Sequence, residues 1–292
     1  MGGCAAGEGM SKQRPEQGVL RLATDRGSRK EGGASRSAAS DNGPNIEGGS
    51  VPVADDLPVF EEDSTLAIPP ELVARTILDE RSLPGEQLRL LAARLRAMGM
   101  DRRLRRIGVV SSAQGEGKTT VALGLCRALA LERQRRVLLV EIDLRRPAID
   151  AALGLAPPPV GLREYLEGES DVPVLRRTSA GFWVLSAGNG VMETPEILSS
   201  PRLPRLLRAA DRVFDYVVLD FPPLMPVADA VVVQDNVDGF VFVVRSRHSP
   251  RETIQKAASL LKPGSIAGVV LNGHHDILPS YGQYAYRRYG KQ

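Results

Sequence analysis

Residues 111–120 read Ser-Ser-Ala-Gln-Gly-Glu-Gly-Lys-Thr-Thr. Their Gly-Lys-Thr end matches the Walker A pattern, in which backbone N–H groups surround phosphates, the lysine reaches the β- and γ-phosphates and the hydroxyl binds Mg²⁺. Ser112 stands where the usual pattern begins with glycine, so this is a variant loop. The pattern predicts nucleotide binding by six consecutive residues: Gly115, Glu116, Gly117, Lys118, Thr119 and Thr120.

The segments around this loop have the order that a phosphate-binding loop requires. Residues 107–110 predict a buried strand entering the loop, and residues 119–131 predict an amphipathic helix leaving it. Because a helix N-terminus attracts anions, the loop and helix together form a phosphate site. Further apolar runs predict strands near 107–112, 137–142, 182–186, 215–220, 239–245 and 266–271. Continuous apolar runs indicate strands covered on both faces, so we expect an α/β, P-loop NTPase-like fold with a largely parallel sheet and helices on both faces.

Two further strands end in carboxylates. One ends at Glu141-Ile-Asp143, where the alternate positions predict that both acidic side chains point to the same side. The other ends at Asp220 before Phe-Pro-Pro, which is the form of a Walker B segment. Ligands of open α/β sheets collect outside the carboxyl ends of the strands, so we expect Lys118, Asp143 and Asp220 to meet there. Thr119 with Asp143 and Asp220 is a sufficient set of hard oxygen ligands for Mg²⁺.

Composition divides the chain of 292 residues unevenly. We expect a disordered tail over 1–60, a helical lead-in over 65–105, a P-loop core over 106–278 and a tyrosine-rich tail over 279–292. The first segment is rich in Gly, Ser, Ala and charge and has no periodic apolar pattern, so it cannot offset the entropy of ordering. In the lead-in, a helical pattern starts at Glu71, is broken by Leu83-Pro84-Gly85 and resumes to about Gly99.

Several classes of protein are disfavoured by composition. No apolar stretch reaches the ~18 residues of a spanning helix, and no secretory signal precedes the core. The formal charge of +3 gives no reason to expect a nucleic-acid partner. Cys4 and Cys126 are not spaced as metal ligands, and His248, His274 and His275 are assigned no role. We therefore expect a cytoplasmic protein.

Four of the six tyrosines lie near the C-terminus, at Tyr281, Tyr284, Tyr286 and Tyr289. They could pack a final strand or bind a partner, since tyrosine combines apolar area with a polar tip. The residues around them, however, give no sustained strand or helix pattern. Phosphorylation is favoured, because donor site and acceptors then share one chain. Tyr281 lies about eight residues past the last expected strand, a reach of about 26–29 Å that suits a neighbouring molecule.

The whole set of motifs resembles the bacterial tyrosine kinases of capsule and exopolysaccharide synthesis, over about residues 80–292. The resemblance is carried by Gly115-Glu-Gly-Lys-Thr119, Glu141-Ile-Asp-Leu-Arg-Arg-Pro147, Leu219-Asp-Phe-Pro-Pro223 with Asp229-Ala230, and the tyrosine-rich tail. It implies an ATP- and Mg²⁺-dependent tyrosine autokinase that phosphorylates its own C-terminal tyrosines. The implied catalytic residues are Lys118, Glu141, Asp143 and Asp220, with Glu141 or Asp143 accepting the hydroxyl proton.

Three positions depart from the family's pattern. Glu141 stands where the family has aspartate, and Gln114 stands where it has proline. The family's oligomerisation helix carries Glu-x-x-Arg-x-x-Arg, whereas this chain has Glu86, Arg89 and then Ala92. We therefore expect self-association that the alanine weakens.

The resemblance also implies a partner and a place of action. The expected partner is a membrane-embedded polysaccharide chain-length or activator protein that recruits the chain to the inner face of the cell membrane. Two other functions stay open. The chain could be a deviant-Walker positioning ATPase, although Ala113 stands where that group carries a lysine. It could also be a non-catalytic, ATP-binding regulatory subunit of a polysaccharide assembly machine.

Overall fold

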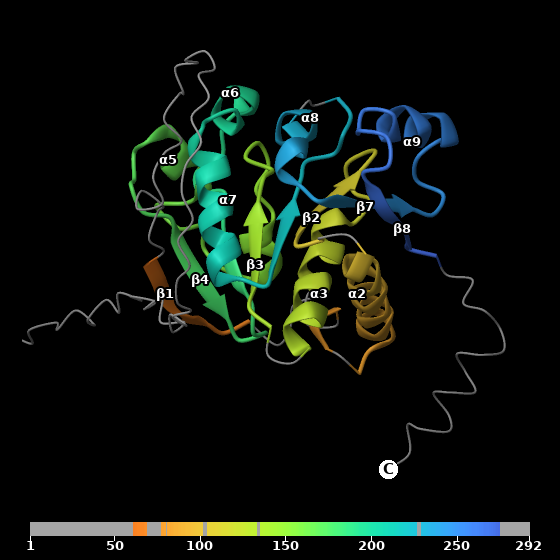
Figure 1. Cartoon of the computed structure of the whole chain (residues 1–292), viewed down its shortest axis with the longest axis horizontal. Helices are drawn as coiled ribbons and strands as arrows, with labels where there is room; N and C mark the ends of the chain where they lie inside the picture. The colour runs from red at the N-terminus through yellow and green to blue at the C-terminus, as the bar shows by residue number, and fades with distance from the viewer. Residues whose placement is uncertain are drawn as a thin grey trace, which may run out of the picture.

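A computed structural model describes residues 61–68, 77–79, 81–101, 104–132, 135–226 and 229–274. Eight strands form one sheet in the order β1-β4-β5-β3-β6-β2-β7-β8 (Figure 1). Their bounds are β1 Glu61–Leu66, β2 Arg106–Ser111, β3 Val137–Glu141, β4 Val174–Thr178, β5 Trp183–Leu185, β6 Tyr216–Asp220, β7 Gly239–Arg245 and β8 Ile266–Asn272. Neighbouring strands are parallel except for β4 and β5, which are antiparallel. The largely parallel sheet is therefore confirmed.

Helices cover both faces of this sheet. Their bounds are α2 Leu83–Asp101, α3 Lys118–Leu131, α4 Ile149–Leu153, α5 Leu162–Glu167, α6 Thr194–Leu198, α7 Arg202–Val213, α8 Asp229–Val233 and α9 Arg251–Ala258, with a 3-10 turn at Gln234–Asn236. One buried apolar cluster joins the sheet to α2, α3 and α4, and a second joins it to α5 through α9. Successive residues of β3 alternate between the two clusters, as the period of a strand requires. The α/β fold with helices on both faces is confirmed.

The central helix α3 fixes the position of the phosphate-binding loop. Its residues 121–126 and 128–130 are buried, and burying one Val or Leu side chain contributes about 1.5–3 kcal/mol. In Figure 1 the arrows of β3 and β6 point toward the edge of the sheet at which α3 begins. Side chains that follow these strands therefore collect around the N-terminus of α3.

The start of α2 differs from the sequence expectation. Residues 77–78 are helical and residues 79, 81 and 82 are not, so Leu83-Pro84-Gly85 follows the break and forms the first turn of α2. The Ser82 hydroxyl caps this turn by accepting a hydrogen bond of 3.0 Å from the Gly85 N–H. Proline is tolerated there because the first-turn N–H groups have no partner within the helix. The predicted break is therefore present, but it lies just before Leu83-Pro84-Gly85.

Strands β1 and β4 were not predicted. Strand β4 lacks an apolar run because its Arg176 is buried, where it pairs with Asp150 and also hydrogen-bonds Ser186. Strand β1 pairs with β4 and overlaps the start of the expected helical lead-in. Residues 71–76 and 80 of the expected helical pattern, the tail over 1–60 and the tail over 279–292 lie outside the described residues.

In the described ranges, none of the helices has both the length and the apolar character needed to cross a membrane.

Candidate nucleotide site

The loop between β2 and α3 has a backbone that only glycine allows. Gly117 has φ 93°, and a Cβ there would lie 2.1 Å from the Asn272 side-chain nitrogen. Gly115 also has a positive φ, of 81°. Both values lie in the left-handed region that residues with a Cβ adopt at a cost. This conformation turns the chain sharply from β2 into the N-terminus of α3.

Glu116 shapes the loop from within. Its carboxylate accepts hydrogen bonds of 2.8 Å each from the Ser112 hydroxyl and the Ala113 N–H, and the residue is fully buried. Both bonds end on Oε2, and the buried Oε1 has no hydrogen-bond partner among the described residues. Thr120 lies in the first turn of α3, and neither residue lines the cavity in front of the loop. The other four residues predicted to bind nucleotide, Gly115, Gly117, Lys118 and Thr119, do line it.

Residues at the ends of β7 and β8 hold the loop from the other side. The Asn272 side-chain amide donates to the Glu116 carbonyl at 2.8 Å, and Arg245 donates to the Gly115 carbonyl at 3.0 Å. The His248 ring nitrogen Nε2 lies 2.9 Å from the Gln114 carbonyl oxygen. Sequence reasoning gave His248 no role and did not find the other two. Their one signal was position, because each follows or ends a strand at the carboxyl edge.

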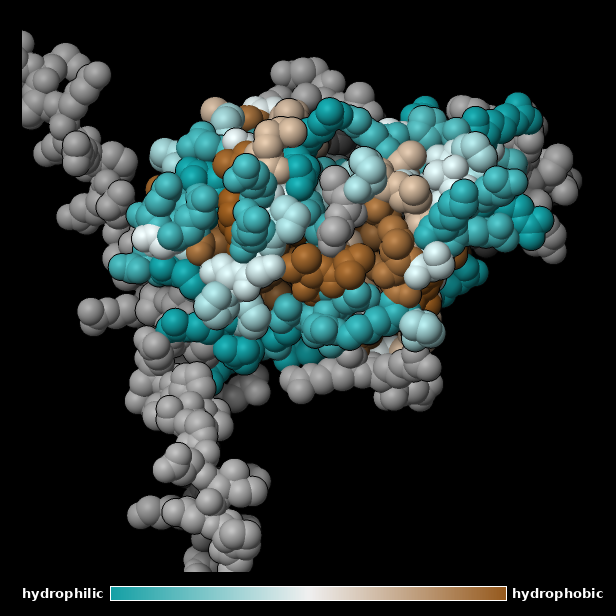
Figure 2. Space-filling model, turned by 90° about the horizontal axis from the view of Figure 1, so that it is seen from above, coloured by the Kyte–Doolittle hydropathy of each residue, from teal (hydrophilic) through white to brown (hydrophobic). Residues whose placement is uncertain are grey.

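A cavity of about 620 Å³ opens in front of the loop. This volume lies within the usual range for sites that bind small molecules and cofactors. One wall is polar and consists of the loop residues, Asp143, Arg145 and Arg146. The other wall is formed by Met192, Pro222, Pro223, Met225 and Pro226. Figure 2 shows this edge of the molecule from above, with a hydrophobic area bordered by hydrophilic side chains. Such a cavity offers charge to phosphates and apolar surface to a flat base.

Lys118 and Asp143 line this cavity, and the buried Asp220 lies close enough to interact electrostatically with both. Lys118 Nζ lies 3.4 Å from Asp143 Oδ2, and both side chains are largely shielded from solvent. Asp143 Oδ1 also accepts a 3.1 Å hydrogen bond from the Arg146 N–H. The lysine is thus held at the start of α3 with its charge directed toward the cavity.

Asp220 lies deepest of the three. Burial raises the pKa of its carboxyl to about 6, while Lys118 and a hydrogen bond from Thr119 act in the opposite direction. Its Oδ1 oxygen is buried and has no hydrogen-bond partner among the described residues. A buried carboxylate oxygen in that state, beside a hydroxyl, fits a divalent cation, because Mg²⁺ prefers hard oxygen ligands. Among the described residues no group of three or more His, Cys, Asp or Glu is placed to hold a metal ion.

Glu141 has different neighbours from Asp143. Strand β3 ends at Glu141, so the strand alternation on which the expectation for both acids rested does not extend to Asp143. Glu141 Oε1 accepts hydrogen bonds from the N–H groups of Ala148 and Ile149, and Oε2 accepts one of 3.2 Å from Ala187. Burial raises the pKa of Glu141 to about 7, although these amide bonds lower it. The side chain joins the start of α4 to the segment after β5 and does not line the cavity.

Arg145 was not among the predicted site residues, although it lies in the motif that starts at Glu141. It lines the cavity, and its Nε lies 3.7 Å from Asp229 Oδ2. Asp229 is fully buried and accepts a 2.8 Å hydrogen bond from the Thr194 hydroxyl. Burial raises the pKa of Asp229, and Thr194 and Arg145 lower it. The start of α6, the start of α8 and the loop after β3 thereby share one polar network.

Tyr281, Tyr284, Tyr286 and Tyr289 lie outside the described residues.

Comparison with known proteins agrees with this site. Residues 107–275 match the family described as the CobQ/CobB/MinD/ParA nucleotide binding domain. The chain is 30% identical to the tyrosine-protein kinase YwqD of Bacillus subtilis over 212 residues, which is 71% of this chain and 88% of that protein. It is 33% identical over 175 residues to the succinoglycan biosynthesis transport protein ExoP of Rhizobium meliloti, covering 57% of this chain and 22% of that protein.

A solved structure has the same fold. The kinase domain of the Escherichia coli tyrosine kinase ETK matches with a TM-score of 0.63 at 26% identity, over 72% of this chain and 84% of that one.

Proposed function

Because the chain belongs to the bacterial tyrosine-protein kinases and carries the CobQ/CobB/MinD/ParA nucleotide binding domain, we propose that it transfers the γ-phosphate of ATP to its own C-terminal tyrosines. The acceptors are Tyr281, Tyr284, Tyr286 and Tyr289. The observation that carries this proposal is the position of Lys118, whose ammonium group lies 3.4 Å from Asp143 at the inner end of the cavity. That arrangement brings a cation for the phosphates and a carboxylate for the hydroxyl to one place.

Each part of the site has a separate task in this reaction. The loop amides and the N-terminus of α3 bind the phosphates, and Lys118 compensates the charge on the β- and γ-phosphates. Thr119 and Asp220 would hold Mg²⁺, and Asp143 would contribute a further oxygen. The chemistry that Mg²⁺ would supply at these oxygens is neutralisation of the negative charge that develops during phosphoryl transfer. The apolar wall with Met192 and Met225 receives the base.

Phosphoryl transfer forms a bond from the tyrosine oxygen to the γ-phosphorus and breaks the bond between that phosphorus and the oxygen bridging it to the β-phosphate. ADP leaves with the bridging oxygen, and the tyrosine proton passes to a carboxylate. We assign that proton to Asp143, because it lines the cavity. Glu141, the other candidate from the sequence, has its two oxygens engaged by three backbone amides. General-base catalysis requires the base to lie within hydrogen-bond reach of the proton.

The proposal includes a role in the synthesis or export of exopolysaccharide or capsule. Similarity to the succinoglycan biosynthesis transport protein supports this role. A membrane-embedded chain-length or activator protein recruits the chain to the inner face of the cell membrane, and transfer occurs between neighbouring copies. Affinity capture of the tagged chain from solubilised membranes tests the partner, which must co-purify with it and bear cytoplasmic segments.

The kinase activity is tested by incubating the full chain with Mg-ATP and mapping phosphotyrosine by mass spectrometry. Lys118→Met should abolish phosphotyrosine, because it removes the charge that holds the transferring phosphate. Lys262→Met is the matched control, since this exposed lysine pairs with Asp235 far from the loop. ATP hydrolysis without phosphotyrosine would instead indicate a positioning ATPase. ATP binding without either reaction would indicate a regulatory subunit.

A further inference from the structure

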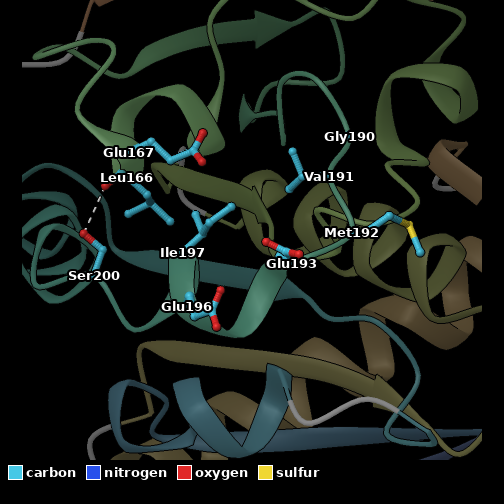
Figure 3. Close-up of a pocket in the computed structure, with 9 residues that line it drawn as sticks. All are labelled: Leu166, Glu167, Gly190, Val191, Met192, Glu193, Glu196, Ile197 and Ser200. Atoms are coloured by element: carbon cyan, nitrogen blue, oxygen red, sulfur yellow. Dashed lines mark hydrogen bonds between the residues drawn. The ribbon is translucent and has the colours of Figure 1, made fainter.

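A second cavity, of about 680 Å³, lies beside the nucleotide cavity. It is formed by the end of α5, the segment before α6, and α6 itself, and Figure 3 shows its side chains. Leu166, Val191 and Ile197 form an apolar band, with the carboxylate of Glu167 on one side and those of Glu193 and Glu196 on the other. The cavity therefore offers both apolar surface and negative charge.

The negative charge is only partly compensated. Glu167 forms an ion pair with Arg163. Glu193 and Glu196 are exposed, and in the part of the chain that the structure describes neither forms an ion pair. A ligand that fits this surface has cationic groups spaced to reach two carboxylates, and aromatic or aliphatic groups between them.

Met192 connects this cavity to the nucleotide cavity. It lines both, and it is 73% exposed. Its carbonyl oxygen accepts a hydrogen bond from Arg145, which also lines the nucleotide cavity. A peptide held against Glu193 and Glu196 is thus beside the site at which the phosphate is transferred.

The chain itself contains a segment of matching chemistry. Residues 284–291 read Tyr-Ala-Tyr-Arg-Arg-Tyr-Gly-Lys, so the segment contains three cations and three tyrosines and no acidic residue. We propose that the cavity between α5 and α6 binds this basic, tyrosine-bearing segment from a second copy of the chain. Arg287 and Arg288 pair with Glu193 and Glu196, and a tyrosine ring packs on the apolar band. This inference rests on the proposed kinase function, which it extends by naming how the substrate is held.

Chain length favours a second copy as the source. Strand β8 is four strands away from β3 in the sheet, and strands lie about 4.8 Å apart, so a chain crosses its own sheet in about 19 Å. Thirteen residues separate Gly273 from Tyr286, and an extended chain of that length spans about 43–47 Å. Docking within one molecule would leave about half of this length to be looped out, so we place the segment in the cavity of a second copy.

Phosphorylation then reverses the attraction. Each phosphotyrosine adds about −1.5 to −2 charge at neutral pH, beside arginines that face two carboxylates. The modified segment is repelled by the cavity and leaves it, so the next segment enters. Docking and release follow from the same pair of glutamates.

Binding is tested separately from catalysis. A fluorescent peptide of residues 279–292 is titrated into the full chain carrying Lys118→Met, and anisotropy is measured. Two exposed ion pairs predict that Glu193→Gln/Glu196→Gln weakens binding by about two- to thirtyfold. Glu252→Gln, an exposed glutamate of α9, should leave binding unchanged. The peptide phosphorylated on its tyrosines should bind more weakly than the unmodified one.

Charge exchange makes the assignment specific. A peptide with Arg287→Glu and Arg288→Glu should bind the Glu193→Lys/Glu196→Lys chain better than it binds the chain with native glutamates. Equal binding of the native peptide to both chains, or no binding to either, overturns the docking site. These results do not depend on phosphotransfer, so they can fail while phosphotyrosine mapping of the wild-type chain still supports the kinase.

The source of the segment is tested by mixing two full chains. The kinase carries all four C-terminal tyrosines as phenylalanine, and the acceptor carries Lys118→Met. We expect the acceptor to be phosphorylated, and Glu193→Lys/Glu196→Lys to slow the reaction only when placed in the kinase chain. Slowing by the same change in the acceptor alone would show that the cavity acts on its own tail, and would overturn the proposal.

Discussion

Glu141 and Asp143 are two residues apart, and the structure predicts opposite consequences for the same acid-to-amide change. In Glu141→Gln, the side-chain oxygen can keep the bonds from Ala148 and Ile149, but the new NH₂ group faces the Ala187 N–H. Leaving a buried donor unpaired costs about 1–3 kcal/mol. At ~2–4 °C per kcal/mol for a domain of this size, the melting temperature should fall by about 2–12 °C.

Asp143→Asn should act on the rate instead. Its carboxylate lines the cavity beside Lys118, and loss of a general base typically costs ~10²–10⁴-fold. Both variants are assayed by calorimetric melting and by the initial rate of phosphotyrosine formation at saturating Mg-ATP, corrected for the folded fraction. Glu141→Gln should keep most of the corrected rate. A drop of ~10²-fold or more in Glu141→Gln with an unchanged melting temperature would refute the reasoning and return the proton to Glu141.

Three further changes test other parts of the structure. Ala92 is fully buried on α2, so Ala92→Arg should destabilise the fold by ~1–3 kcal/mol or more and should not restore a family-like assembly. The control Ala97→Arg, at an exposed position of the same helix, should not destabilise the fold. A larger oligomer of Ala92→Arg with an unchanged melting temperature would contradict this prediction. Asp229→Asn removes the negative charge that pairs with Arg145 in the nucleotide cavity, so Mg-ATP binding measured by calorimetry should weaken by about two- to tenfold. An unchanged Kd would show that Asp229 does not act on the nucleotide through Arg145. Burial raises the pKa of Glu164, but hydrogen bonds from the N–H groups of Asn189 and Gly161 outweigh it and hold the pKa below its usual value. The ionised carboxylate therefore stabilises the fold at neutral pH, and this contribution is lost below pH ~4. The difference in unfolding free energy between wild type and Glu164→Gln should shrink on acidification, and a difference that stays constant with pH would contradict the prediction.

Local sequence was sufficient for the parts of this protein that depend on neighbouring residues. The glycines of the loop, the apolar run of each parallel strand and the acidic residue that ends β6 all specify backbone conformation or burial within a few positions. Because parallel strands present their carboxyl ends at one edge, those local features already brought Lys118, Asp143 and Asp220 together. The fold class and the centre of the site could therefore be predicted.

Tertiary structure decided what depends on partners distant in the sequence. Strand β4 has only two apolar residues, Val174 and Leu175, and its Arg176 can be buried because it pairs with Asp150. Ala92 is an alanine because α2 packs that face against α3, which no pattern within α2 reveals. Glu141 and Asp143 look alike in sequence, yet β3 ends between them and the amides of α4 and of Ala187 take one carboxylate away from the cavity. The role of a buried carboxylate depends on the hydrogen-bond donors around it. For Glu141 these donors lie between seven residues (Ala148) and 46 residues (Ala187) further along the chain.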